Sequence, residues 1–265
     1  MTAPNDFFAD FLYSPAHHEC QAPPFILRPF VERLWVARDA GGKRVRVIPD
    51  GCIDIRLDRT DPRGCVIVGP FTQCSTIHPT KPYEFVGARF HPLGASALLK
   101  LPLQEMQNCR VPLADVLNDA GELMDSVAAA PSLSAAALAL ARYLSARAPS
   151  APSQHRAATV AVSALIQRRG SIAVAALAER LGVSRQYLNT LFIERIGFGP
   201  KVFSRIMRFR GLLAGNGWTN GSWAERAHAA GYYDQAHMIA EFKQFAGVTP
   251  EQYQLIRGTH TQAAA

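Results

Sequence analysis

The stretch SRQYLNTLFIERIG, Ser184 to Gly197, decides the fold because its pattern recurs 50 residues later as DQAHMIAEFKQFAG, Asp234 to Gly247. Each copy follows a small-residue helix, a glycine and a short turn, and each predicts a helix of about a dozen residues that ends at glycine. A short turn holds the second helix across the first, where it can project into a DNA major groove. The repeat therefore predicts two helix-turn-helix units. The matched pairs are Ser184 and Asp234, Leu188 and Met238, Phe192 and Phe242, Gly197 and Gly247, and Pro200 and Pro250.

The first unit combines a supporting helix, Ile172 to Leu181, with a second helix, Arg185 to Ile196. Gly182 is placed to end the supporting helix, and the hydroxyl of Ser184 can accept a hydrogen bond from an unpaired N–H in the next first turn. Apolar residues on the second helix recur at helical spacing and predict one inward stripe. The stripe comprises Leu188, Leu191, Phe192 and Ile196.

The opposite face of this helix is polar and presents Arg185, Gln186, Asn189 and Thr190. Gln or Asn can pair bidentately with adenine, and such a contact discriminates between bases by about 1 to 3 kcal/mol. The alternative is an ordinary amphipathic helix with a solvated face, since the same pattern is general among surface helices.

The second unit pairs a supporting helix, Trp223 to Ala230, with a helix capped by Asp234 and running to Ala246. Its outer face begins with Gln235 and Ala236, and His237 and Lys243 are candidates for the groove rim or phosphates. Its inward stripe is Met238, Phe242 and Phe245. A further helix, Lys201 to Leu213, joins the two units, and His155 to Arg169 predicts a helix before the first unit.

All of the excess positive charge lies in the part of the chain that carries the repeat. Residues 1–153 hold 15 Lys or Arg and 15 Asp or Glu, whereas residues 154–265 hold 13 and 6, which accounts for the net charge of +7. A basic domain joined to a neutral one suggests that the basic domain binds a polyanion. A merely soluble basic surface is the alternative.

Proline usage changes at the same boundary. Sixteen of the 18 prolines precede residue 154, which favours a strand-and-turn domain followed by a helical one. The segment APSAPSQ, Ala148 to Gln154, is typical of a solvated linker. No 18-residue apolar run and no signal peptide are present, so we expect neither secretion nor membrane insertion.

Residues 155–257 resemble the DNA-binding domain of the AraC/XylS family of bacterial transcription regulators. The resemblance rests on LAERLGVSRQYLNTLF (Leu177 to Phe192), GFGPKVFSRIMRFR (Gly197 to Arg210), GYYDQAHM (Gly231 to Met238) and FKQFAGVTPEQY (Phe242 to Tyr253). It implies seven helices, RNA polymerase as a partner, promoter DNA as the ligand, and more often activation than repression. It also implies DNA contacts in both units and on the connecting helix. By the resemblance these residues are Arg185, Gln186, Asn189 and Thr190, then Gln235, Ala236, Ile239 and Ala240, together with Arg208. Further candidate DNA contacts are Ser184, Tyr187, His237 and Lys243.

Two departures from the family pattern affect this expectation. Family members often have Arg where this chain has Thr190 and Ala240, and both substitutions remove a long donor. We therefore predict that the first unit dominates sequence reading and that the second mainly positions the protein. Gly211, Gly215 and Gly217 also weaken the end of the connecting helix, because Gly costs about 1 kcal/mol against Ala in a helix interior.

The expected fold class is α+β. Residues 1–150 form a sensing or dimerisation domain, a small β-barrel or cupin-like domain with strands over about 25–90 and trailing helices over about 93–147. Residues 151–265 form an all-α DNA-binding domain with its motifs at about 172–196 and 221–246. The predicted strands are FVERLWV, KRVRVIP, CIDIRLD, CVIVG and YEFVGARF.

The family places effector sensing or dimerisation in the N-terminal domain, and VIPDGCIDIRLD resembles a domain found on some members. Candidate pocket residues are Trp35, Asp54, Arg89 and His91. Each also has a structural interpretation: Trp35 as core, Asp54 and Arg89 as an ion pair, and His91 as a cap before Pro92.

The histidines and cysteines point weakly to metal or redox chemistry. HHEC, His17 to Cys20, contains soft ligands for zinc or copper, but neither a metal nor another cofactor is expected without partners from elsewhere. The five cysteines form no close CxxC pair, which argues against a disulfide scaffold or structural zinc site. Thiol sensing by Cys52 or Cys74 is an alternative.

The sequence therefore predicts a cytoplasmic transcription regulator that binds double-stranded promoter DNA. A small-molecule effector and a second copy of the chain are its further candidate partners. Two alternatives stay open: an effectorless DNA-binding and interaction module, and an enzyme-like barrel fused to a DNA-binding domain. We expect no enzyme, because the chain has no nucleophile elbow, phosphate loop or metal-ligand spacing.

Overall fold

A computed structural model describes residues 18–42, 45–149, 156–214 and 222–255. An N-terminal antiparallel sheet domain followed by helices precedes a helical C-terminal domain, so the α+β class is confirmed. The linker expected at Ala148 to Gln154 falls largely on residues 150–155, outside the described ranges.

The N-terminal strands form a six-stranded sheet in the order β1-β2-β7-β4-β5-β8, in which every neighbouring pair is antiparallel. A separate two-stranded ladder pairs β3 with β6. The strands are β1 (His18–Gln21), β2 (Val31–Asp39), β3 (Val45–Val47), β4 (Ile53–Asp58), β5 (Val66–Val68), β6 (Ser75–Ile77), β7 (Tyr83–Phe90) and β8 (Arg110–Pro112).

The central strands β4 and β7 are buried along almost their whole length. In β4 the apolar Ile53, Ile55 and Leu57 alternate with charged residues, and the buried Asp54 of β4 pairs with the buried Arg89 of β7. The predicted strands in this domain all occur, whereas β1, β6 and β8 were not predicted. These three are short and polar and lack the alternation that marks a half-buried strand.

Helices follow and cover the sheet. They are α1 (Gly94–Leu99), α2 (Leu113–Val116), α3 (Ala120–Ala128) and α4 (Leu133–Ser145). The hydroxyl of Ser132 caps α4 by accepting from the N–H of Ala135 at 3.1 Å. Helix α4 packs against β2 and β7, and its residues Ala136, Leu140 and Leu144 are buried in the same core as the sheet.

The C-terminal domain contains α5 (Arg156–Gln167), α6 (Val174–Arg180), α7 (Arg185–Ile196), α8 (Pro200–Ala214), α9 (Trp223–Ala229) and α10 (Gln235–Ala246), and residues 250–255 are also helical. The bounds of α7 are those predicted. Helix α8 continues through Gly211, which lies against the side chain of Arg169. Gly215 and Gly217 lie outside the described residues.

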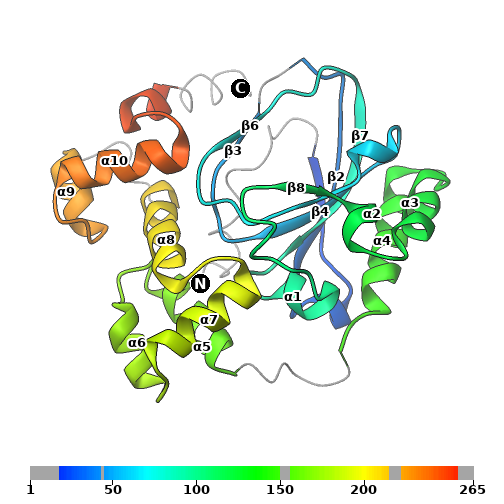
Figure 1. The fold of residues 1–265 in the computed structure, drawn as a ribbon. Coiled ribbons are helices and arrows are strands. Elements are labelled where there is room, and N and C mark those ends of the chain that lie inside the picture. The colour runs from blue at the N-terminus through cyan, green and yellow to red at the C-terminus, as the bar shows by residue number, and fades with distance from the viewer. Residues whose placement is uncertain (1–17, 43–44, 150–155, 215–221, 256–265) are drawn as a thin grey trace.

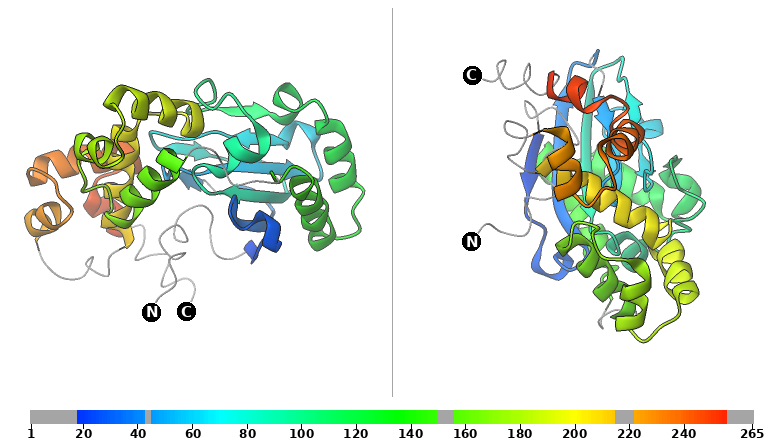
Figure 2. Two further views of the ribbon diagram at one scale, coloured as in Figure 1. Left: turned by 90° about the horizontal axis from the view of Figure 1, so that it is seen from below. Right: turned by 90° about the vertical axis from the view of Figure 1, so that its left-hand side faces the viewer.

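The sheet domain occupies the middle of the molecule. Helices α3 and α4 lie on one side of it and the helical domain lies on the other, as two perpendicular views show (Figures 1 and 2). The helical core is built from α5 to α10, but Ile48 and Cys52 of the sheet domain are buried in it as well. The two domains therefore share a continuous apolar contact.

Candidate nucleic-acid interface

Local hydrogen bonds fix the start of both candidate reading helices. The Ser184 Oγ accepts from the Tyr187 N–H at 3.0 Å at the start of α7, and the Asp234 Oδ1 accepts from the His237 N–H at 2.7 Å at the start of α10. Both caps were predicted from sequence. Because each cap satisfies a donor that the helix cannot, the two helices begin at equivalent places in the two units.

The inner stripe of each reading helix is buried. On α7 the buried side chains are Leu188, Leu191, Phe192 and Ile196, and on α10 they are Met238, Phe242 and Phe245, as predicted. Phe209 of α8 makes an edge-on ring contact with Phe242 at a centroid distance of 5.2 Å. The inward stripes therefore anchor both helices on α8.

The outer face of α7 is exposed to solvent. It carries every residue predicted there, namely Arg185, Gln186, Tyr187, Asn189 and Thr190, beside the exposed cap Ser184. Tyr187 leaves 52% of its surface exposed, which is unusual for an aromatic side chain in a packed domain. The Asn189 Oδ1 lies beside Gly199, 2.6 Å from the place where a Cβ of that residue would be. This face presents amide and hydroxyl groups of the kind that bond base edges.

The outer face of α10 is exposed at Gln235, Ala236, His237, Ala240 and Lys243, whereas Ile239 is half-buried. The His237 ring makes an edge-on contact with Tyr232 at 5.3 Å, and its Nε2 lies 3.7 Å from Glu241. Glu241 itself is buried, which the sequence pattern did not indicate. A buried acid on a reading helix could have been suspected only from the cationic Arg205 on the neighbouring helix.

Arg208 lies at the turn of the second unit. Its Nη1 donates to the carbonyl of Gly231 at 3.3 Å, and its guanidinium lies 4.9 Å from the centre of the Tyr232 ring. Burial raises the pKa of Tyr232. The side chain predicted to contact DNA thus also holds the turn that positions α10.

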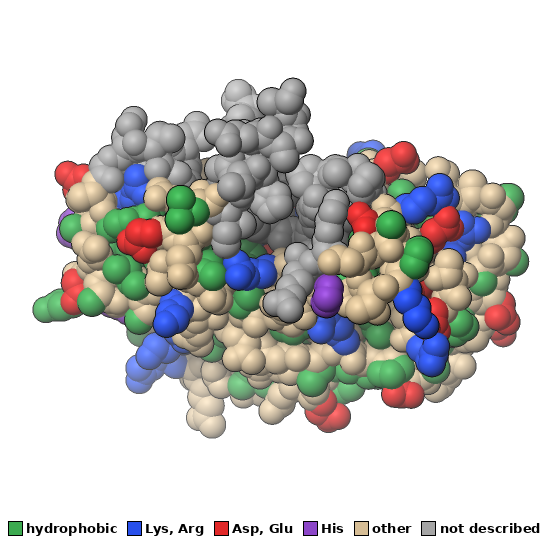
Figure 3. Space-filling model, turned by 90° about the horizontal axis from the view of Figure 1, so that it is seen from above, with side chains coloured by type: hydrophobic (Ala, Val, Ile, Leu, Met, Phe, Trp, Pro, Cys, Tyr) green, Lys and Arg blue, Asp and Glu red, His purple; other side chains and the backbone are tan. Residues whose placement is uncertain are grey.

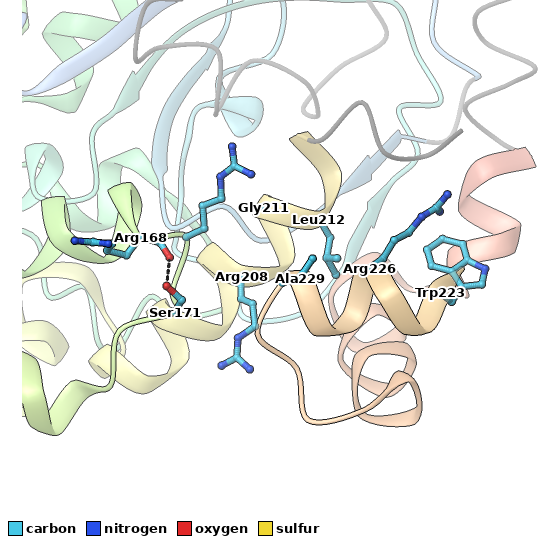
Figure 4. Close-up of a pocket in the computed structure, with 10 residues that line it drawn as sticks. Arg168, Ser171, Arg208, Gly211, Leu212, Trp223, Arg226 and Ala229 are labelled. Atoms are coloured by element: carbon cyan, nitrogen blue, oxygen red, sulfur yellow. Dashed lines mark hydrogen bonds between the residues drawn. The ribbon is translucent and has the colours of Figure 1, made fainter. Parts of the chain in front are cut away.

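A hollow of about 280 Å³ lies between the end of α5, α8 and α9 (Figure 4). Its apolar wall includes Leu212 and Trp223. The guanidinium groups of Arg168, Arg208 and Arg226 point in different directions in Figure 4 and do not converge. In a view from above, Lys and Arg side chains on the helical domain also stand among acidic and apolar ones (Figure 3). The basic charge is spread around the units on these faces.

Three of the four predicted pocket residues meet inside the sheet domain. The Arg89 Nε and Nη2 donate to Asp54 at 3.2 and 2.7 Å, and Trp35 Nε1 donates to the Asp54 Oδ1 at 3.2 Å. The Trp35 ring lies across Gly87 on the next strand. All three side chains are buried and bonded to one another, so they have the core and ion-pair roles given above as structural interpretations.

Asp50 completes this cluster, which the sequence did not predict. Its Oδ2 accepts from the Arg89 Nη1 at 2.5 Å, and its Oδ1 accepts from the Cys52 N–H at 2.8 Å. Burial alone would raise the pKa of Asp50, but the charges of Arg89 and of Arg210 on α8 outweigh burial and lower it. Burial raises the pKa of nearby Glu32.

His91 follows β7 and is half-buried against the backbone of Arg28, to which it is hydrogen-bonded. Burial lowers its pKa, so the neutral ring is favoured. His91 therefore lies on Arg28 and Phe30, apart from the bonds that join Trp35, Asp54 and Arg89.

Burial favours the thiol form of three cysteines. Burial raises the pKa of Cys52, Cys65 and Cys74, which disfavours the reactive thiolate. His18, Glu19 and Cys20 belong to the edge strand β1, whereas His17 lies outside the described residues. Within those residues no three His, Cys, Asp or Glu side chains gather as metal ligands would.

Comparison with known families covers both domains. Residues 19–112 match a domain of unknown function, DUF6597, and residues 177–255 match a helix-turn-helix domain. The C-terminal domain is a helix-turn-helix domain of the AraC type. A search of curated proteins finds no match.

Among solved structures, ToxT from Vibrio cholerae in a P21 crystal form is similar at 12% identity and a TM-score of 0.41, covering 91% of this chain and 98% of that chain. ToxT from Vibrio cholerae O395 gives 12% and 0.39, with 90% and 96% covered. Unsaturated fatty acid bound wild-type ToxT from strain SCE256 gives 10% and 0.39, with 91% and 96% covered. In the described part of the chain, none of the helices has the length and apolar character needed to span a bilayer.

Proposed function

We propose that this chain is a sequence-specific transcription regulator that reads double-stranded promoter DNA with two helices, α7 and α10. The observation that carries the proposal is the pairing, in one chain, of two capped helices whose inner stripes are buried on one connecting helix and whose outer faces are exposed. A recognition helix must pack firmly against its own domain on one face and expose the opposite face to DNA, and both helices do so.

The proposed roles divide between base reading and backbone contact. Gln186 and Asn189 read base edges from α7, because an amide both donates and accepts and can pair with adenine. Ser184, Arg185, Tyr187 and Thr190 surround them. On α10, Gln235 and Ala236 face the groove, while His237 and Lys243 contact its rim or phosphates. Arg208 supports the second unit and adds positive charge between the two.

We further propose that residues 1–150 form a sensing or dimerisation domain and residues 151–265 the DNA-binding domain. The buried cluster of Trp35, Asp54 and Arg89 is the place where a polar effector would compete with internal bonds. Such an effector would shift the population between domain arrangements. A second copy of the chain and RNA polymerase are the proposed protein partners, activation the proposed outcome and the cytoplasm the proposed location.

The test is fluorescence anisotropy of the full chain on DNA from upstream of its own and neighbouring genes, with scrambled DNA as the control. Salt is varied between about 50 and about 200 mM, since phosphate contacts weaken steeply over this range. Tighter binding to the native fragment that survives added salt supports sequence reading. Equal binding to both DNAs that collapses with salt contradicts it.

A further inference from the structure

The sheet domain touches all three parts of the double reading unit. It contacts the C-terminal end of α7, the connecting helix α8 and the C-terminal end of α10. Residues 50–52 contact α8, Pro70 and Leu103 contact the end of α7, and Cys74 contacts the end of α10. Pro70 to Cys74 form the 70–74 segment, which joins β5 to β6.

The sheet domain meets α8 through an apolar contact and a charged interaction. A Cβ placed on Gly51 would lie 2.7 Å from Phe203 Cε2 and 3.5 Å from Met207 Cε, so the backbone of this turn rests directly on α8. Arg210, one helical turn further on, is 2% exposed and interacts electrostatically with Asp50. The sheet domain is thus held on the middle of the helix that separates the two reading helices.

The 70–74 segment contacts the ends of both reading helices. Gly197 ends α7 with a φ of +98°, and a Cβ there would lie 2.6 Å from Pro70 Cγ and 2.7 Å from the Leu103 carbonyl oxygen. At the other end of the segment, the Cys74 N–H donates to the Gln244 carbonyl on α10 at 3.3 Å. Gly247, which ends α10, would bring a Cβ to 3.1 Å from the Cys74 Sγ.

Two side chains outside the reading units fasten this segment to the sheet domain: Gln107, whose Nε2 donates to the Thr72 Oγ1 at 3.3 Å, and Asn108. The Asn108 Oδ1 accepts from the Thr72 N–H at 2.8 Å, and its Nδ2 donates to the Thr72 Oγ1 at 3.0 Å. The Asn108 N–H also donates to the Pro70 carbonyl at 3.1 Å. Residues of the segment therefore cannot move apart without breaking bonds to Asn108.

We propose that the 70–74 segment is a positioning element that fixes the separation of α7 and α10, and so the spacing of the two DNA boxes that the chain binds together. The inference rests on the proposed function. Helix α8 follows α7 directly and packs against α10, and the 70–74 segment adds a second connection that runs from the C-terminal end of α7 to the C-terminal end of α10. Each base pair inserted between two boxes moves them about 3.4 Å further apart. Two helices packed on one core cannot shift by this distance without losing packing contacts.

The test begins with selection of DNA by the full wild-type chain from a random pool. The two selected boxes are then moved together or apart by one base pair at a time, and binding is measured by anisotropy. The wild-type chain is expected to prefer one spacing by at least about fivefold over its neighbours, comparable to one mismatched base pair.

Two variants loosen the positioning element without changing a reading face. Asn108→Gly removes the Asn108 side-chain bonds to Thr72 at a backbone φ of +59° that glycine adopts freely, and Cys74→Trp places a large ring against Gly247. Asn118→Gly and Cys20→Trp are the matched controls, because both residues are exposed on the same domain. Thermal unfolding identifies a variant that does not fold, in which case the other variant decides.

The expected result is a spacing preference that falls toward onefold in both variants while each box keeps its base preferences, with both controls like wild type. A sharp wild-type spacing profile that survives in a folded variant overturns the inference and leaves the proposed function intact. A wild-type chain that selects no DNA sequence overturns the proposed function instead.

Discussion

The Nε of Arg205 on α8 donates to the Oε1 of Glu241 on α10 across 2.5 Å. The Arg205 Nη2 also donates to the Gln244 Oε1 at 2.8 Å. Only 4% of the Glu241 side chain is exposed, so its carboxylate depends on a partner supplied by the connecting helix. The second reading helix is consequently fastened to α8 by charge as well as by its apolar stripe.

Replacing Arg205 with Met should destabilise the second unit, because it leaves a buried carboxylate without its strongest donor. We expect the free energy of unfolding to fall by about 1 to 3 kcal/mol, as measured by urea denaturation. Arg185→Met, at an exposed position on α7, is the control and should change stability little. Equal stability of the Arg205 variant and wild type would show that the ion pair contributes nothing.

Asn189→Ala should weaken binding to the selected DNA by about 1 to 3 kcal/mol with little effect on scrambled DNA, since it removes a bidentate base contact. Gln235→Ala on α10 should weaken DNA binding less, because Ala240 gives the second unit no long hydrogen-bond donor at that position. Anisotropy on both DNAs measures each loss, and Asn118→Ala serves as the neutral comparison. A larger loss for Gln235→Ala than for Asn189→Ala would reverse the assignment of the dominant unit.

Lys243→Ala should reduce the slope of log K against log salt by roughly 0.9, the value expected when one phosphate contact is lost. Its side chain is exposed on α10, and substitutions at exposed positions usually change stability little. Binding titrations at four salt concentrations measure the slope. Lys81→Ala, exposed on the sheet domain, should leave it unchanged, and an unchanged slope for Lys243→Ala would remove this residue from the interface.

Asp50→Asn should lower the stability of the chain at neutral pH by about 1.5 to 3 kcal/mol, because the hydrogen bond that Arg89 donates to Asp50 loses its charged acceptor. The folded-state pKa of Asp50 lies below 3.8, its value without the protein environment. The stabilisation that the ionised Asp50 carboxylate gives to the folded chain is therefore present above pH 3.8 and is lost as the pH falls through the folded-state pKa.

The variant should accordingly lose less stability than wild type on acidification below pH 3.8. Urea denaturation across this range measures the difference, with Asp125→Asn at an exposed site as the control. Parallel stability curves for the Asp50 variant and wild type would contradict the role assigned to this carboxylate.

The sequence by itself determined the reading helices, because their signals are local. Ser184 and Asp234 cap helices whose apolar residues recur every three or four positions, and Gly197 and Gly247 end them in the left-handed conformation. The strands β4 and β7 were likewise evident from short stretches of apolar residues bounded by turn signals. In each case the side chains that define the element lie within a dozen residues of one another, so no distant contact was needed.

Only the tertiary structure decided the pairings between distant segments. The short strands β1, β6 and β8 exist because a neighbouring strand supplies their hydrogen bonds, and their own residues carry no strong preference. Asp50 joins Arg89 from 39 residues away, and Cys74 meets α10 from the other domain. A buried charge is acceptable only where folding brings its partner, so periodicity could not reveal that Asp50 and Glu241 are internal.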